Sequence, residues 1–156
     1  MPIPAPLTEL VEELRPLDRN ERSETLLDYA DHFEPVAPEV ALRPFDERHR
    51  APRCESDAYV WATDRPDGTL KFHFAVENPQ GVSAKAWAVI LDQTLSGQPI
   101  EQVAMVPGDV LYDIFGRDLS MGKGQGLLGM LELVTFEAQK RLTERRVKAM
   151  REPGAR

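Results

Sequence analysis

The apolar residues near the start of the chain are spaced as on one side of a helix. They are Leu7, Leu10, Val11 and Leu14. Pro16 ends this helix, because proline cannot donate the next backbone hydrogen bond. A second helix begins at Asp18, where Glu21 completes an acidic capping box, and it stops before Pro35. We expect it to bury four apolar side chains: Leu26, Leu27, Ala30 and Phe33. The two segments predict an αα-hairpin.

Polar and apolar residues alternate in the middle of the chain, which is the pattern of a half-buried strand. One face of residues 69–76 carries four apolar side chains: Leu70, Phe72, Phe74 and Val76. Residues 57–63 precede it as a second strand, and the linker 64–68 has the proline and the Asp-Gly pair of a tight reversal. We therefore predict an antiparallel pair. Before it, residues 34–52 contain four prolines and predict an irregular connector, with a short strand near Glu47–Arg50.

The second half of the chain has helical patterns. Residues 82–95 are apolar on nearly every side, which is typical of a buried helix, and Gly97 fits its end. Residues 99–105 and 108–115 predict short helical turns. A long amphipathic helix follows from the spacing of Leu127, Leu131, Val134, Ala138 and Leu142. The order of elements predicts an α+β fold, with helices packed on one face of a small antiparallel sheet.

The composition is that of an ordinary globular protein, with 42% hydrophobic and 29% charged residues in 156. We expect a single domain over residues 1–156, with a core at about 7–141 and a basic end at 138–156. No apolar run approaches the roughly 18 residues of a membrane span. The first residues lack the pattern of a secretory signal, and one cysteine makes no internal disulfide. A cytoplasmic protein is expected.

The charge is unevenly placed along the chain. The net charge of −7 argues against a general nucleic-acid binder. From residue 138 onward there are seven basic and two acidic residues, so this end carries +5 and residues 1–137 carry the remaining −12. Such a run is typical of a solvated helix face. A docking surface for an acidic partner is the alternative.

The one cysteine, Cys54, lies in a charged segment just before the first predicted strand. The thiolate is the nucleophilic form of cysteine, and the neighbouring Arg53 favours it. Glu55 and Asp57 oppose that effect, so the sequence leaves the sign of the net effect open. A cysteine without a role is the simplest alternative.

Residues 52–60, PRCESDAYV, resemble the persulfide-accepting loop of the SufE family, the sulfur-acceptor proteins of iron–sulfur cluster assembly. Five residues fall on the positions of the family pattern: Cys54, Ser56, Ala58, Tyr59 and Val60. Arg53 stands where many members have glycine, the residue that tolerates a positive φ. Residues 85–91 resemble the family's apolar helix. Residues 119–127 resemble the start of its last helix, with Lys123 in place of an arginine.

The resemblance implies a SufE/IscU-like sandwich and the role of a sulfur acceptor. Cys54 would take persulfide sulfur from a SufS-type cysteine desulfurase, stimulate that enzyme and pass the sulfur to an Fe–S scaffold. Arg53, assisted by Arg50 and Lys123, would stabilise the sulfur anion, and Ser56 would hydrogen-bond the loop backbone. Pyridoxal phosphate is expected on the partner, with no cofactor or metal on this chain. The protein would act as a sulfur-transfer partner, monomer or homodimer, rather than as a stand-alone enzyme.

Such a carrier benefits from hiding its persulfide from water-borne thiols and oxidants. We therefore expect the Cys54 loop to hold the thiol inward at rest, with the buried helix at Trp87 as an apolar wall, and to turn it outward when a partner docks. Two other functions stay open. One is sulfur transfer to another acceptor, as in tRNA thiolation, and the other is an interaction module whose cysteine is incidental.

Other chemistries match the sequence poorly. A zinc site or a cluster scaffold of the IscU kind needs several closely spaced ligands, and one cysteine is too few. A Cys–His hydrolase needs a base held by a third group, and no pairing with His32, His49 or His73 follows from the sequence. The glycine-rich residues 122–126 lack the spacing of a phosphate-binding loop, and we expect a flexible lead-in to the last helix.

Overall fold

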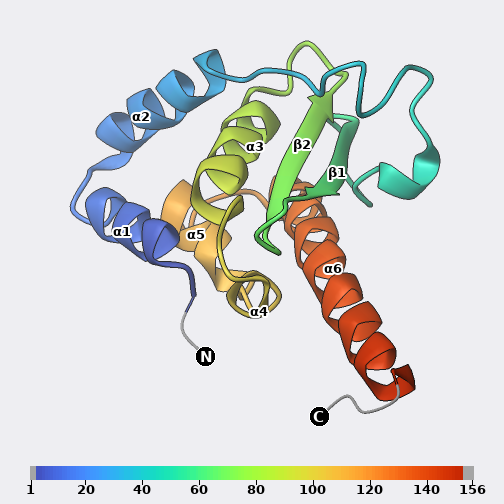
Figure 1. Cartoon of the computed structure of the whole chain (residues 1–156). Coiled ribbons are helices and arrows are strands. Elements are labelled where there is room, and N and C mark those ends of the chain that lie inside the picture. Colours follow the sequence, from blue (N-terminus) through green and yellow to red (C-terminus); the bar gives the residue numbers. More distant parts are fainter. Residues whose placement is uncertain (1–2, 153–156) are drawn as a thin grey trace.

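Two short antiparallel strands and the helices packed against them make up the fold, which the computed structural model describes for residues 3–152 (Figure 1). The elements in chain order are α1 (Ala5–Leu14), α2 (Arg19–Asp31), the 3-10 helix η1 (Glu47–His49), β1 (Ala58–Asp64), β2 (Leu70–Val76), α3 (Val82–Leu95), α4 (Ile100–Val103), α5 (Asp109–Phe115) and α6 (Met121–Arg151). The predicted α+β class is confirmed.

The hairpin of β1 and β2 has helices on one face and the connector on the other. Its register runs from the pair Ala58–Val76 to the pair Asp64–Leu70. Helix α3 packs on β2 and α6 on β1. On the outer face, the Phe45 ring lies 4.9 Å from that of Trp61, so residues of the irregular connector cover the side that the helices leave open. The hairpin lies beside α3 and the first half of α6 in Figure 1.

Helix α3 is the centre of the core, as its apolar pattern predicts. Trp87 is fully buried, and its indole Nε1 donates a 2.9 Å hydrogen bond to the carbonyl of Leu127 in α6. The N-terminal helices α1 and α2 both pack on α3, and α1 also packs on α5. The predicted αα-hairpin is therefore wrong in its packing: the two helices share α3 as their support rather than forming a tight pair.

Two further expectations are wrong in detail. The strand expected near Glu47–Arg50 is the 3-10 helix η1, because the Asp46 side chain accepts a hydrogen bond from the Arg48 N–H, and only Arg50 bridges to Tyr59. Leu27 is 53% exposed, because it lies on the side of α2 that faces away from α3. The capping box of Asp18 and Glu21 is confirmed.

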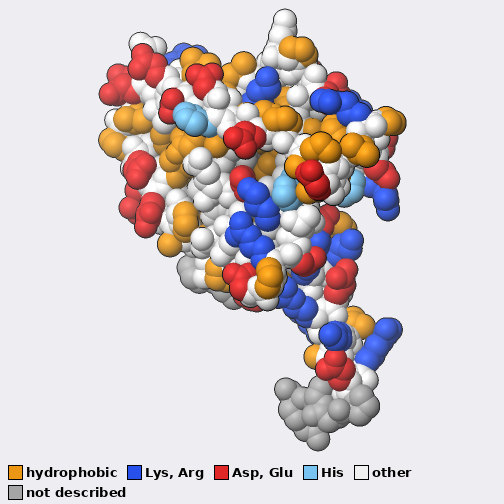
Figure 2. Space-filling model, turned by 45° about the horizontal axis from the view of Figure 1, so that its top comes forward, with side chains coloured by type: hydrophobic (Ala, Val, Ile, Leu, Met, Phe, Trp, Pro, Cys, Tyr) orange, Lys and Arg blue, Asp and Glu red, His pale blue; other side chains and the backbone are white. Residues whose placement is uncertain are grey.

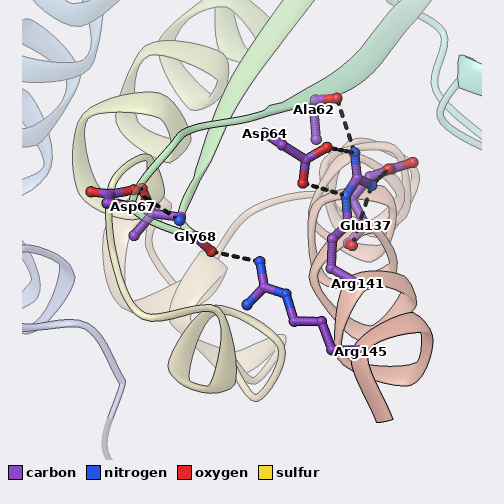
Figure 3. Close-up of polar contacts among 8 residues, drawn as sticks. Ala62, Asp64, Asp67, Gly68, Glu137, Arg141 and Arg145 are labelled. Carbon is purple, nitrogen blue, oxygen red and sulfur yellow. Dashed lines mark hydrogen bonds and ion pairs between the residues drawn. The ribbon is translucent and has the colours of Figure 1, made fainter. Parts of the chain in front are cut away.

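The C-terminal half of α6 leaves the body of the molecule and projects from it (Figures 1 and 2). Its last attachments bind the hairpin turn (Figure 3). Arg141 contacts the carboxylates of Asp64 and Glu137, and Arg145 donates a 2.8 Å hydrogen bond to the carbonyl of Gly68. Within residues 3–152, no helix is both long enough and apolar enough to cross a membrane.

Candidate functional site

Cys54 lies in a tight turn that leads into β1. Its carbonyl accepts a hydrogen bond from the Asp57 N–H at 3.3 Å, and the Ala51 N–H donates to the carbonyl of Ala58 at 2.8 Å. The residue is only 7% exposed and belongs to the hydrophobic core. The thiol is therefore turned inward, the arrangement that we expect at rest.

The backbone on both sides of the cysteine is left-handed. Arg53 has φ 58° and Asp57 has φ 50°. Position 53 thus needs the conformation that glycine adopts most easily, and this chain reaches it with an arginine.

The Cys54 loop rests on a glycine surface of α6. A Cβ added to Gly126 would lie 3.1 Å from the Cα of Cys54, and one added to Gly129 would lie 2.5 Å from the carbonyl oxygen of Pro52. At Gly129 a larger residue would push the loop away, because real Cβ atoms essentially never come that close to backbone. At Gly126 the loop would have to move by a few tenths of an ångström. The expected flexible lead-in over residues 122–126 is therefore wrong. These residues are already helical, and one of them, Gly126, supports the loop together with Gly129.

The other side of the loop is held at the start of α3. Asn78 donates its backbone N–H to the carbonyl of Ser56 at 3.1 Å and its side-chain amide to the carbonyl of Glu55 at 3.2 Å. A Cβ on Gly81 would lie 3.1 Å from the hydroxyl of Ser56. Among the described residues, the Ser56 carbonyl accepts its hydrogen bond from Asn78, just before α3, and Ser56 also lines a cleft.

That cleft has a volume of about 290 Å³ and lies between the first turns of α3 and α6. It is lined by Cys54, Glu55, Ser56, Gln80, Gly81, Val82, Ser83, Ser120, Gly122, Lys123, Gly126 and Leu127. The free backbone N–H groups at a helix start carry partial positive charge. The first turns of α3 and α6 and the cationic Lys123 therefore line the cleft and favour an anion beside Cys54, whereas the carboxylate of Glu55, which also lines it, opposes one.

The four supporting residues expected from the sequence divide into two groups. Ser56 and Lys123 line the cleft with Cys54. Arg50 and Arg53 lie around a second hollow on the other side of the loop, which Cys54 also touches. Arg53 pairs with Glu132 at 3.4 Å, and Arg50 contacts Asp57.

Lys123 is the cation with its charge available to the cleft. It is exposed, and within residues 3–152 it takes part in none of the ion pairs. The two arginines expected to help the sulfur anion are instead engaged by carboxylates. Of these three cations, Lys123 is therefore the one that lines the cleft without a carboxylate partner among residues 3–152.

The histidines lie apart from the cleft and make other hydrogen bonds. The Nδ1 atom of His49 lies 2.8 Å from the carbonyl of Val60, and Nε2 of His73 lies 2.9 Å from the hydroxyl of Thr63. His32 contacts its own helix. Over the described residues, no three His, Cys, Asp or Glu side chains are grouped to hold a metal ion.

The wall of the cleft that comes from α3 was not anticipated from the sequence. Gln80 and Ser83 both line it. The signal that could have located it is the break at residues 78–81, because the N-terminus of a buried helix must follow directly.

Comparison with known proteins identifies a family and similar solved structures. The family described as "SufE: Fe-S metabolism associated domain" matches residues 8–138. A hypothetical protein of Thermus thermophilus, solved in solution, is similar over 90% of this chain and 98% of its own, with 27% identity and a TM-score of 0.70. No curated protein matches.

Proposed function

Because the chain belongs to the SufE family, whose domain is associated with Fe–S metabolism, we propose that Cys54 accepts sulfur from a cysteine desulfurase. The partner would be of the SufS type, and the sulfur would pass on to an Fe–S scaffold. The observation that carries this proposal is the position of Cys54, inward-facing in a cleft bounded by two helix starts and Lys123.

The transfer step conserves persulfide and needs no outside oxidant. The Cys54 thiolate attacks the terminal sulfur of the partner's cysteine persulfide, R–S–SH. A new S–S bond forms to Cys54 while the partner's S–S bond breaks, and the partner leaves as the thiolate R–S⁻. The product, Cys54–S–SH, loses its proton readily and then carries the negative charge on its outer sulfur.

The residues around Cys54 have distinct parts in this step. Lys123 and the N–H groups at the starts of α3 and α6 stabilise negative charge on the attacking and the product sulfur. The glycine surface of α6 keeps the loop close enough for these groups to act. The low exposure of Cys54 keeps bulk thiols from the persulfide.

The experiment is intact-mass analysis after incubation with a SufS-type desulfurase and L-cysteine. We expect wild type to gain one sulfur atom, which maps to Cys54 and which a reducing thiol removes, and to raise the turnover of the desulfurase. Cys54→Ser should keep the circular-dichroism spectrum of wild type, because one buried hydroxyl costs only about 1–3 kcal/mol. The variant should neither gain a sulfur atom nor raise the turnover of the desulfurase. A persulfide that forms on the desulfurase and never reaches Cys54 would contradict the proposal.

A second stage of the same experiment identifies the acceptor. Wild type loaded with labelled sulfur is mixed with an Fe–S scaffold in one reaction and with a tRNA-thiolation system in another. The proposal expects label on the scaffold. Label on tRNA alone would replace the Fe–S acceptor while leaving the chemistry of Cys54 intact.

A further inference from the structure

The projecting end of α6 carries an apolar line on its solvent side. Phe136, Val147 and Met150 are 54%, 38% and 80% exposed. At 3.6 residues per turn, these three positions lie within about 60° of one another around the helix axis. Thr143 falls on the same line. The helix therefore presents an uncovered edge on which Phe136 lies about 16 Å along the axis from Val147 and farther from Met150, with Thr143 between them.

Basic residues flank this line, and the helix end is held in a fixed direction. Lys140, Arg146 and Arg151 lie beside the apolar edge, whereas Arg141 and Arg145 face the other way and bind the hairpin turn (Figure 3). The favourable effect of cations on a helix C-terminus extends over the last turn only. It accounts for Arg151 and does not extend to Lys140 and Arg146, which are exposed on the helix surface.

The opposite charge gathers on α1 and α2, at the far edge of the molecule. Residues 5–34 contain nine acidic and three basic residues, a net charge of −6. All nine carboxylates are exposed, and acidic side chains, in red, recur along the left edge of Figure 2. The guanidinium of Arg22 is turned inward, where it donates to the carbonyls of Leu14 and Ile114.

The outer side of α2 matches the edge of α6 in chemistry. Its exposed Leu27 lies between Glu24 and Asp31, which are three positions before it and four after it on the same helix face. An apolar centre flanked by carboxylates faces an apolar line flanked by cations. We propose that the end of α6 docks on α2 of a second copy of this chain.

The charges favour α2 of a second copy over another α6 end, a nucleic acid or an anionic membrane as the partner of this helix end. Two α6 ends packed on each other would place cations against cations. A nucleic acid or an anionic membrane would be repelled by residues 1–137, which carry −12. In a two-fold dimer each copy contributes one helix end and one acidic face, so the contact forms twice.

The test measures molar mass by sedimentation of the full chain, at low and at high ionic strength. We expect a dimer at low salt that dissociates as salt screens the contact. Arg146→Glu with Arg151→Glu on α6, or Glu24→Lys with Asp31→Lys on α2, should each weaken dimerisation at least roughly tenfold. Arg48→Glu with Arg65→Glu, two exposed arginines outside both faces, is the matched control and should dimerise as wild type does.

Mixing the two charge-reversed variants distinguishes this contact from any other. Each contact in the mixed dimer again joins opposite charges, so the mixture should recover the wild-type mass at low salt. The inference is overturned if wild type stays monomeric up to millimolar concentration, if the variants dimerise unchanged, or if the mixture does not recover. None of these results depends on sulfur transfer by Cys54.

Discussion

Gly129 lies beneath Pro52 so closely that an added Cβ would stand 2.5 Å from the proline carbonyl. Three residues earlier in α6, Gly126 has the same relationship to Cys54, at 3.1 Å from its Cα. Helix α6 thus fixes how closely the Cys54 loop packs on the body of the protein. Because Gly126 and Gly129 have no side chains, the loop backbone lies directly on the helix and the thiol is buried.

Replacing Gly129 by alanine should therefore lift the loop. The added methyl meets a backbone carbonyl, which cannot rotate away, so we expect a loss of about 1–3 kcal/mol in the free energy of unfolding. This loss outweighs the helix propensity that alanine adds. Alkylation of Cys54 by iodoacetamide should become faster. Denaturant unfolding and the alkylation rate measure the two effects.

Gly122 provides the matched control in the same helix. An added Cβ there meets nothing within 4 Å. Gly122→Ala should raise the free energy of unfolding by up to about 1 kcal/mol through helix propensity alone. Equal effects of the two substitutions would show that Gly129 is not a seat for the loop.

Lys123→Ala should slow sulfur transfer to Cys54 without changing stability. The ammonium group is the cation of the cleft that no carboxylate engages in the described structure, so its loss removes stabilisation from a developing sulfur anion. We expect a decrease of about tenfold, or roughly 1.4 kcal/mol, in the single-turnover rate with a persulfide-loaded desulfurase. Lys123→Arg should retain most of the rate, because it keeps the charge.

The same single-turnover assay on Arg53→Ala compares the contribution of Arg53 to the transfer rate with that of Lys123. Arg53 pairs with Glu132 and lines the hollow on the other side of the loop. Its removal should affect the rate less than that of Lys123. The reverse order would return the main electrostatic role to Arg53.

Docking of a desulfurase should expose the thiol. Cys54 is 7% exposed in the free protein, so a small alkylating reagent should label it slowly. A desulfurase whose own active cysteine is replaced can bind without transferring sulfur, and by favouring the outward state it should speed the labelling. A rate that is already fast in the free protein and unchanged by the partner would rule out the inward state.

His73 should make the fold sensitive to mild acid. Burial lowers the pKa of His73, and the positive charge of Lys71 acts in the same direction. In the unfolded chain the imidazole takes its proton near pH 6.5, so the unfolded state binds more protons as the pH falls from 7 to 5. The free energy of unfolding therefore decreases over this window.

His73→Gln should show a smaller decrease, because an amide has no charge to gain and still reaches the Thr63 hydroxyl. Urea unfolding of both proteins at pH 7 and pH 5 measures the difference. Identical pH dependence of the two would assign the acid sensitivity to other groups.

The sequence determined most of the elements but not how they meet. The buried helix α3 and the β-hairpin were predictable, because an apolar helix and an alternating strand each carry a local period. Leu27 shows the limit, since its apolar character says nothing about which side of α2 faces α3. The predicted αα-hairpin was wrong for the same reason. A short connection keeps α1 and α2 close in the chain, but it does not determine that both pack on α3.

The candidate site was predictable in its cysteine but only partly in its surroundings. The pattern around Cys54 identified the loop, but the change from glycine to Arg53 left its backbone path open, and the structure gives Arg53 a positive φ. The ion pair of Arg53 with Glu132 joins residues 79 positions apart, which no local pattern reports. The role of Gly126 and Gly129 likewise depends on contacts with residues about half of the chain away, so Gly126 was read as part of a flexible segment.

The seat of the loop on α6 also affects when the site comes into being. During synthesis Cys54 leaves the ribosome well before Gly126 and Gly129, which lie more than 70 residues later in the chain. At that stage the thiol has neither its cleft nor Lys123 beside it. The cleft therefore forms only after α6 has been made, and a chain ending before Met121 would have the cysteine but lack the helix on which its loop rests.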